Sequence, residues 1–193
     1  MPAMARTLKQ QVRAERRALR RTLAAERDLA ADDQALAAAL EPLLDALAIG
    51  PGDVVTAYQS LPVEPPTEAV CRLLAARGAQ VIVPITLVSY DLDWFDLADA
   101  HERPLGIDAV AAARLLLVPA LAVDATGTRL GQAGGCYDRT LPRVNPDSPV
   151  VALLHPGEFS ADPLPRDPWD MPVTAVLTAD GYRALTARDP HSP

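Results

Sequence analysis

The chain has 193 residues, of which 49% are hydrophobic and two are cysteine, and its formal net charge is −7. This composition supports a sizeable core, but no apolar run approaches the ~18 residues that a membrane span needs. Two cysteines are too few for a disulfide framework or a zinc site. Residues 1–29 hold eight of the 18 cations, so the remainder is acidic and lacks the basic face that nucleic acids require. We therefore expect a cytoplasmic protein without a membrane or nucleic-acid partner.

The first fifty residues predict two helices. Apolar residues between Leu8 and Leu23 recur at spacings of four, seven and four, which predicts a helix over residues 4–29. Such a helix is about 39 Å long, so we expect its end to project from the body. Leucines that share one face predict a second helix over 30–48, and the Gly-Pro-Gly sequence that follows ends it.

Short apolar runs alternate with helical segments in the rest of the chain, and Thr67 is a suitable N-cap for the next helix. The predicted strands cover residues 53–59, 80–85, 92–97, 115–123, 150–154 and 173–179. The remaining predicted helices cover residues 67–77, 136–143 and 181–187. Because apolar strands alternate with helices, we predict a single α/β domain over residues 1–193. Its architecture is a three-layer α/β/α fold with a mostly parallel central sheet and a long N-terminal helix.

The segment RLGQAGGCYDR at residues 129–139 has the sharpest local pattern. It follows a predicted buried strand and opens a predicted helix. Backbone N–H groups of a glycine loop, together with a helix N-terminus, favour phosphate. The segment lacks the Gly-Lys-Ser/Thr of a Walker A loop and the G-x-G-x-x-G of dinucleotide-binding proteins. By itself it is compatible with a phosphate-binding loop or with a plain strand–helix connection.

A longer stretch, LLLVPALAVDATGTRLGQAGGCYDRTL, resembles the signature of the 5-formyltetrahydrofolate cyclo-ligase family, P-G-L-A-F-D followed by R-L-G-x-G-x-G-Y-Y-D-R-x-L. The matching residues are Pro119, Leu121, Ala122, Asp124, Arg129, Leu130, Gly131, Gly135, Tyr137, Asp138, Arg139 and Leu141. The resemblance implies cyclisation of 5-formyltetrahydrofolate to 5,10-methenyltetrahydrofolate, with ATP as co-substrate, Mg²⁺ as cofactor, and ADP and phosphate as products. We expect a monomer whose partner is a reduced folate.

The resemblance also implies site residues, although it assigns none as catalytic. The ATP site would comprise the family's K-x-x-x-R pair and the loop: Lys9, Arg13, Arg129, Leu130, Gly131, Gln132, Ala133, Gly134, Gly135, Cys136 and Tyr137. The folate site would comprise Arg13, Gln59, Glu64, Gln132, Gly135 and Cys136. Two acids, Asp138 and Asp170, would hold magnesium, for which carboxylate oxygens are suitable ligands.

Several positions depart from the family pattern, and most surround the expected substrate. They are Gln59, Pro66, Ala133, Cys136, Trp169 and Thr174, and the family's Gln after the fifth strand is not evident in LLHPGEF. Two other interpretations therefore stay open. One is a family member that activates a different N-formyl or amide compound with ATP, and the other is a non-catalytic folate- or nucleotide-binding protein.

Other residues have both a functional and a structural interpretation. His155 follows a predicted strand, where a general acid would lie, but a hydrogen-bonded structural histidine is favoured. The aromatic residues around 90–95 either wall a pterin or face the core. These are Tyr90, Trp94 and Phe95. On the first helix we expect Arg16, Arg17 and Arg20 to lie on a solvated face.

Overall fold

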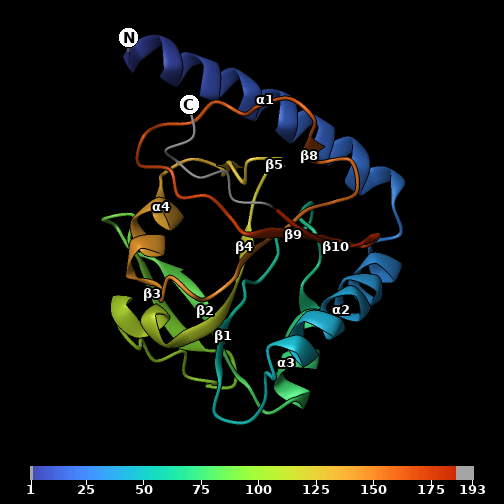
Figure 1. Cartoon of the computed structure of the whole chain (residues 1–193), viewed down its shortest axis with the longest axis vertical. Coiled ribbons are helices and arrows are strands. Elements are labelled where there is room, and N and C mark those ends of the chain that lie inside the picture. Colours follow the sequence, from blue (N-terminus) through green and yellow to red (C-terminus); the bar gives the residue numbers. More distant parts are fainter. Residues whose placement is uncertain (1, 186–193) are drawn as a thin grey trace.

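A seven-stranded sheet runs through the centre of the structure, a computed structural model that describes residues 2–185 (Figure 1). Its strands are β1 (Val54–Thr56), β2 (Gln80–Thr86), β3 (Leu92–Asp96), β4 (Ala113–Pro119), β7 (Val150–Leu153), β9 (Ala175–Thr178) and β10 (Gly181–Ala184). They are ordered β10-β9-β7-β4-β1-β2-β3. The inner neighbours are parallel, and β3 and β10 pair antiparallel at the two edges, which confirms the predicted mostly parallel sheet.

The central strands are apolar on both faces because the sheet is covered on both sides. Along β4, Leu115 and Leu117 belong to one core, whereas Leu116 and Val118 belong to the other, as the alternation of side chains along a strand requires. All four residues of β7 are buried. This burial explains the nearly continuous apolar runs of the sequence.

Helices and short 3-10 turns form the two outer layers. The first core takes leucines from α2 (Leu29–Ala46) and residues from α3 (Glu68–Ala76), which lie on the same side of the sheet in Figure 1. The second core takes residues from η1 (Ile107–Ala112), α4 (Cys136–Thr140) and η2 (Leu141–Arg143). The predicted three-layer architecture is confirmed, and its second helical layer is built from short elements.

The start of α3 is capped from a neighbouring helix. Thr67 occupies the predicted N-cap position, but its hydroxyl donates to the carbonyl of Tyr58 at 2.6 Å. The N–H of Ala69 instead donates to both carboxylate oxygens of Asp33 in α2, each at 3.0 Å. Asp33 is 8% exposed, so this cap also ties α2 to α3.

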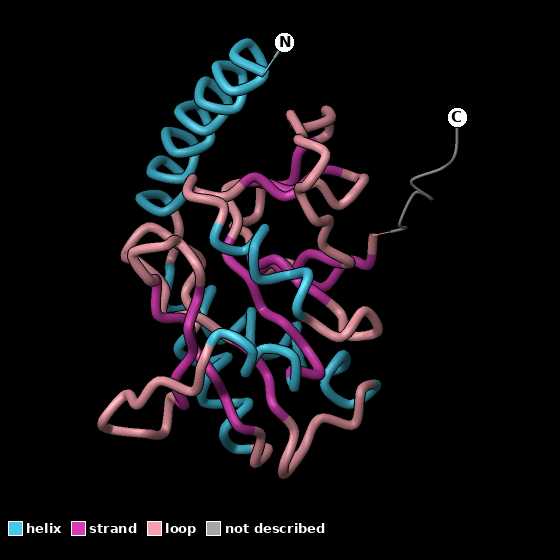
Figure 2. Tube along the Cα trace, turned by 90° about the vertical axis from the view of Figure 1, so that its left-hand side faces the viewer, coloured by secondary structure: helices cyan, strands magenta, loops and turns pink. Residues whose placement is uncertain are grey.

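Helix α1 (Pro2–Glu26) lies across one end of the molecule, and its first turns extend beyond the rest of the chain in Figure 2. Asp28 then caps α2 by accepting from Ala30 N and Ala31 N. Val12 of α1 packs against a small apolar cluster of Ala122, Leu130 and Leu164. Within residues 2–185, no helix combines the length and apolar character that crossing a membrane needs.

The predicted strand over 115–123 is wrong as one element. The chain leaves β4 at Pro119 and enters β5 (Ala122–Asp124), which belongs to a second sheet with β6 (Arg129–Leu130) and β8 (Phe159–Ser160), in the order β6-β5-β8. Leu121 N donates to Leu130 O, so its backbone pairs with the second sheet. The run is apolar throughout because both sheets bury it, and hydropathy therefore gives no sign of the break.

The predicted helix over 181–187 is also wrong. Residues 181–184 form β10, which pairs antiparallel with β9 through a tight hairpin, and the last two residues of the prediction lie outside the described residues. Gly181 has φ +138°, a conformation that glycine favours and a helix does not contain. Pairing with an open sheet edge stabilises this segment as a strand, despite its short helical pattern.

Candidate functional site

The glycine-rich loop (residues 131–135) connects β6 to α4 at one end of the sheet. Gly135 is in the left-handed conformation at the N-cap of α4, with φ +68°. Ala133 has φ +127°, which is strained for a residue with a Cβ atom and explains why glycine is usual there. The exposed Arg139 donates to the carbonyl of Gly134 at 2.7 Å and thereby braces the loop from α4.

Arginines of α1 hold the other side of this loop. Arg13 Nε donates to Gly131 O at 3.0 Å, and Arg17 Nε donates to the Gln132 side chain at 3.0 Å. Arg17 is therefore a loop contact rather than the solvated cation that the sequence predicted. Burial and the neighbouring Arg17 guanidinium lower the pKa of Arg13, whereas nearby carboxylates raise it. A bound anion would offset both effects, since it places an opposite charge beside the two guanidinium groups.

Lys9 lies one turn before Arg13 and contacts two acids from the other end of the chain. Its ammonium is 2.6 Å from Asp167 Oδ2 and 2.5 Å from Asp170 Oδ2, and the lysine is 7% exposed. Asp167 N donates to Asp170 Oδ2 at 2.9 Å, which fixes the second acid. The cation expected at ATP and an acid expected at magnesium are thus paired with each other. Asp167 was not predicted as a site residue.

The other predicted metal ligand, Asp138, is half-buried and paired with an arginine. Its Oδ1 accepts from Arg129 Nη2 at 3.1 Å, and Arg129 also lies over the Tyr137 ring, 5.3 Å from its centroid. Within residues 2–185, no group of three or more His, Cys, Asp or Glu side chains is arranged to hold a metal. The pair Asp138 and Asp170 nevertheless fits Mg²⁺, because this ion takes one or two carboxylates and completes its shell with phosphate oxygens and water.

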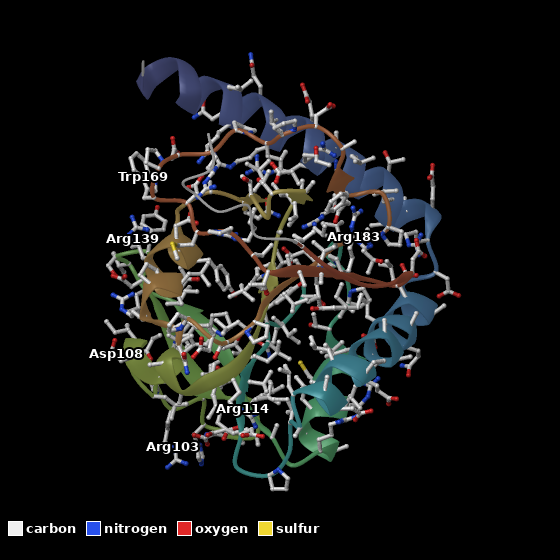
Figure 3. All side chains as sticks on the ribbon, viewed as in Figure 1. Arg103, Asp108, Arg114, Arg139, Trp169 and Arg183 are labelled. Atoms are coloured by element: carbon white, nitrogen blue, oxygen red, sulfur yellow. The ribbon has the colours of Figure 1, made fainter. Side chains whose placement is uncertain are left out.

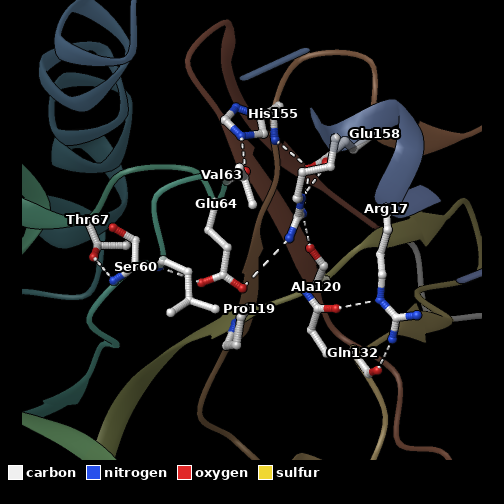
Figure 4. A network of polar contacts seen from close by, with 12 residues as sticks. Arg17, Ser60, Val63, Glu64, Thr67, Pro119, Ala120, Gln132, His155 and Glu158 are labelled. Carbon is white, nitrogen blue, oxygen red and sulfur yellow. Dashed lines mark hydrogen bonds and ion pairs between the residues drawn. The ribbon is translucent and has the colours of Figure 1, made fainter. Parts of the chain in front are cut away.

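The loop after β1 brings Glu64 to the same region. Glu64 is 6% exposed, and its Oε2 accepts from Leu61 N at 3.0 Å (Figure 4). On the opposite side its Oε1 lies 3.8 Å from the guanidinium of Arg20. The structure therefore holds this carboxylate in a fixed and buried position. Gln59, from the same loop, is exposed.

A cavity of about 240 Å³ lies between α1, the glycine-rich loop and the loop after β1. All the predicted site residues line it except Gly134: Lys9, Arg13, Gln59, Glu64, Arg129, Leu130, Gly131, Gln132, Ala133, Gly135, Cys136, Tyr137, Asp138 and Asp170. Residues separated by up to 161 positions in sequence are therefore neighbours here.

Six further residues line the cavity, and the sequence analysis did not assign them to the site: Tyr58, Pro84, Thr86, Leu92, Pro119 and Ala120. Most lie at or near strand ends on the carboxyl side of the sheet. The rule that ligands of open α/β sheets bind at these ends was a signal that could have identified them.

Two buried tyrosines of the cavity wall have hydroxyl groups without a hydrogen-bond partner among the described residues. These are Tyr58 and Tyr137. Burial raises the pKa of Tyr58 well above its usual value, and the nearby Glu64 adds to the effect. The pKa of Tyr137 is also raised by burial. Both hydroxyls therefore stay protonated and can donate a hydrogen bond.

The aromatic residues around β3 have separate roles. Trp94 and Phe95 are buried in the two cores and do not line the cavity, so the structural interpretation is correct for them. Tyr90 is 55% exposed, and its ring lies close to Gly134 of the glycine-rich loop. Trp169, next to Asp170, is 68% exposed and lies on the same side of the molecule as Arg139 of α4 (Figure 3).

His155 is structural, as the favoured interpretation predicted. It is 1% exposed, its Nε2 is 3.1 Å from Val63 O, and it does not line the cavity. Three residues later, Glu158 is fully buried and pairs with Arg20, so the expectation that Arg20 is solvated is wrong. Glu158 was not predicted as a site residue.

A parallel sheet with a glycine-rich loop, a helix N-terminus and a row of cations around one cavity is typical of α/β proteins that bind phosphorylated ligands. The model of the 5-formyltetrahydrofolate cyclo-ligase family matches residues 5–179. The chain belongs to this family, which is ATP-dependent.

A curated relative supports this assignment, and two solved structures share the fold. The 5-formyltetrahydrofolate cyclo-ligase of Mycolicibacterium smegmatis is 33% identical over 159 residues, which cover 74% of this chain and 81% of that protein. The fold resembles that of a 5,10-methenyltetrahydrofolate synthetase from Mycoplasma pneumoniae, with a TM-score of 0.69, 17% identity, and coverage of 91% and 98% of the two chains. The enzyme of the same name from Aquifex aeolicus gives a TM-score of 0.63 with 21% identity, over 98% and 96% of the chains.

Proposed function

We propose that this protein is a cytoplasmic, monomeric enzyme that cyclises 5-formyltetrahydrofolate to 5,10-methenyltetrahydrofolate, with ATP as co-substrate, Mg²⁺ as cofactor, and ADP and phosphate as products. The observation that carries the proposal is the cavity, where the cations of α1, the glycine-rich loop and Glu64 meet. Family membership supplies the reaction class.

The chemistry requires activation of an amide oxygen. The formyl oxygen attacks the γ-phosphorus of ATP, so that a C–O–P linkage forms and ADP leaves. N10 of the folate then bonds to the formyl carbon and loses its proton, and phosphate departs with the electrons of the C–O bond. No covalent bond to the enzyme forms, so Cys136 needs no role as a nucleophile.

The chain's residues would supply position and charge. Lys9, Arg13 and the backbone N–H groups of the glycine-rich loop would neutralise the phosphates. Asp138 and Asp170 would hold Mg²⁺, which contributes further positive charge beside the phosphate oxygens. Glu64 would accept hydrogen bonds from N–H groups of the pterin and so align N10 with the formyl carbon, because alignment lowers the barrier to ring closure.

The direct test is the absorbance of 5,10-methenyltetrahydrofolate after the protein is mixed with ATP, Mg²⁺ and 5-formyltetrahydrofolate. Product formation with stoichiometric phosphate release is expected. A protein that binds MgATP and releases phosphate only with another N-formyl or amide compound would instead be the alternative family member. The departures from the family pattern at Gln59, which lines the cavity, and at Trp169, which adjoins Asp170, favour this alternative. Binding of ligand without any turnover would identify a non-catalytic relative.

A further inference from the structure

Arg20 of α1 lies behind the wall of the cavity and connects to it through a buried ion cluster, defined here as Arg20, Glu64 and Glu158 (Figure 4). Arg20 Nε is 2.6 Å from Glu158 Oε1 and its Nη2 is 2.7 Å from Oε2, which is a bidentate pair. The Nη2 also donates to the carbonyl of Ala120, and Nη1 lies 3.8 Å from Glu64 Oε1. Arg20 itself does not line the cavity.

The charges of this cluster do not balance. One guanidinium faces two carboxylates, and the exposed fractions are 2% for Arg20, 0% for Glu158 and 6% for Glu64. The bidentate contacts assign the guanidinium mainly to Glu158, because paired N–H···O bonds are the strongest arrangement for these groups. Glu64 therefore retains much of its negative charge at the cavity wall, where a ligand with N–H donors would offset it.

Glu158 and the nearby His155 also fix the loop that carries Glu64. Val63 O lies 3.1 Å from His155 Nε2, and His155 N donates to Glu158 Oε2 at 2.9 Å. Glu64 Oε2 is held by Leu61 N. A carboxylate offers about four acceptor positions, so Glu64 still has positions for ligand donors after these two contacts.

We propose that Arg20 is a positioning residue for the folate, acting through Glu64. This inference rests on the proposed function, in which Glu64 holds the pterin. The guanidinium sets the place of the Glu64 carboxylate and, because Glu158 saturates two of its nitrogens, keeps Glu64 ordered without neutralising it. Loss of this geometry impairs folate binding and ring closure, whereas the phosphate contacts of Lys9 and Arg13 are separate and stay intact.

Arg20→Lys is the informative variant, and Arg16→Lys is its matched control. Lysine keeps the charge but lacks the planar fork, so it cannot make the bidentate pair with Glu158 that sets the guanidinium geometry beside Glu64. Arg16 lies one turn earlier on α1 and donates to Ser160 Oγ at 2.8 Å, without a contact to the Glu64 loop. We expect Arg20→Lys to lower kcat/KM for 5-formyltetrahydrofolate at least tenfold while KM for ATP changes less than twofold. Arg16→Lys should change neither.

A double-mutant cycle separates positioning from general structural damage. If Arg20 acts through Glu64, the change Glu64→Gln will cost much less in the Arg20→Lys background than in the wild type. If the double variant loses kcat/KM by the product of the losses in the two single variants, the inference is wrong. An equal rise in the KM values for folate and for ATP would also overturn it. If Arg20→Lys does not fold, Glu158→Gln repeats the cycle, because it frees the guanidinium to neutralise Glu64 and should give the same folate-specific loss.

Failure of the inference is distinguishable from failure of the proposed function. A wild-type protein that cyclises 5-formyltetrahydrofolate but shows independent effects of the two substitutions retains its function and loses the Arg20 role. If the wild type shows no turnover, the same cycle is measured by calorimetric binding of 5-formyltetrahydrofolate. The four proteins compared are the wild type, the two single variants and the double variant. If the wild type neither converts nor binds this folate, both the proposed function and the inference are wrong.

Discussion

The ammonium of Lys9 and the carboxylate of Asp170 form an ion pair with 2.5 Å between Nζ and Oδ2, across 161 residues of sequence. Asp167 accepts from the same ammonium at 2.6 Å. The pair joins α1 to the loop before β9 and places a cation where the proposed site also needs a metal-binding acid. Under the proposed function, ligand binding would redistribute these contacts, and Lys9 would have both a structural and a binding role.

Replacement of Lys9 tests the two roles separately. Lys9→Met keeps the side-chain length but leaves two acids without their cation, and breaking a buried pair in this way costs about 3 kcal/mol of unfolding free energy. We also expect the dissociation constant for ATP to rise about tenfold or more, because charge-assisted phosphate contacts are lost. Denaturant unfolding and calorimetry measure the two effects. The control is Arg21→Met, an exposed position on the same helix, which should leave both unchanged. Weaker folding with unaltered ATP affinity would limit Lys9 to structure.

Metal binding should depend on the nucleotide. The proposed metal site has two carboxylates, Asp138 and Asp170, each already paired with a cation, and Mg²⁺ would complete its shell with phosphate oxygens. We expect Mn²⁺, followed by its electron paramagnetic resonance signal, to bind weakly to the protein alone and at least tenfold more tightly with ADP present.

The acids themselves provide the matching variants. Asp138→Asn and Asp170→Asn should each abolish the increase in Mn²⁺ affinity that ADP causes. Each should also reduce turnover by at least a hundredfold, with the thermal unfolding transition retained. Tight Mn²⁺ binding without nucleotide, or turnover at the wild-type rate in either variant at limiting Mg²⁺, would contradict this metal assignment.

Cys71 should resist alkylation. Burial raises the pKa of its thiol to about 11, so at pH 8 the reactive thiolate is reduced about a hundredfold or more relative to an ordinary cysteine. Iodoacetamide should therefore modify Cys71 far more slowly in the native protein than in protein unfolded by urea, as measured by peptide mass spectrometry. Between pH 8 and 9 the native rate should rise about tenfold, whereas that of the unfolded chain should rise about threefold. Equal slopes would mean that the thiol titrates normally.

The cap that Asp33 provides to α3 should stabilise the fold without affecting catalysis. Asp33→Ala removes the acceptor for Ala69 N, and loss of a helix cap lowers the unfolding free energy by about 1–2 kcal/mol. Urea unfolding measures this change. Asp45→Ala is the control, because its pair with Arg77 is largely exposed and should contribute less than about 1 kcal/mol. An equal effect of the two substitutions would refute the capping role.

Much of the fold could be predicted because hydrophobic period and helix signals are local. The apolar stripes predicted α1 and α2 to within a few residues, and β2, β3, β7 and β9 lie where short apolar runs predicted strands. The exceptions have a common cause. The break between β4 and β5, and the strand β10, depend on which backbone each segment pairs with, and pairing partners are distant in sequence.

The sequence by itself determined the set of groups that belong together, because the ordered motif from Pro119 to Leu141, the Lys9–Arg13 pair, Glu64 and Asp170 follow one family pattern. Only the tertiary structure decided what each group contacts. It buried Arg20 between Glu158 and Glu64, turned Lys9 onto Asp170, and left Trp94 in the core. A motif specifies which residue types occur at which spacing. Burial and ion pairing depend instead on how α1 packs against loops more than a hundred residues away.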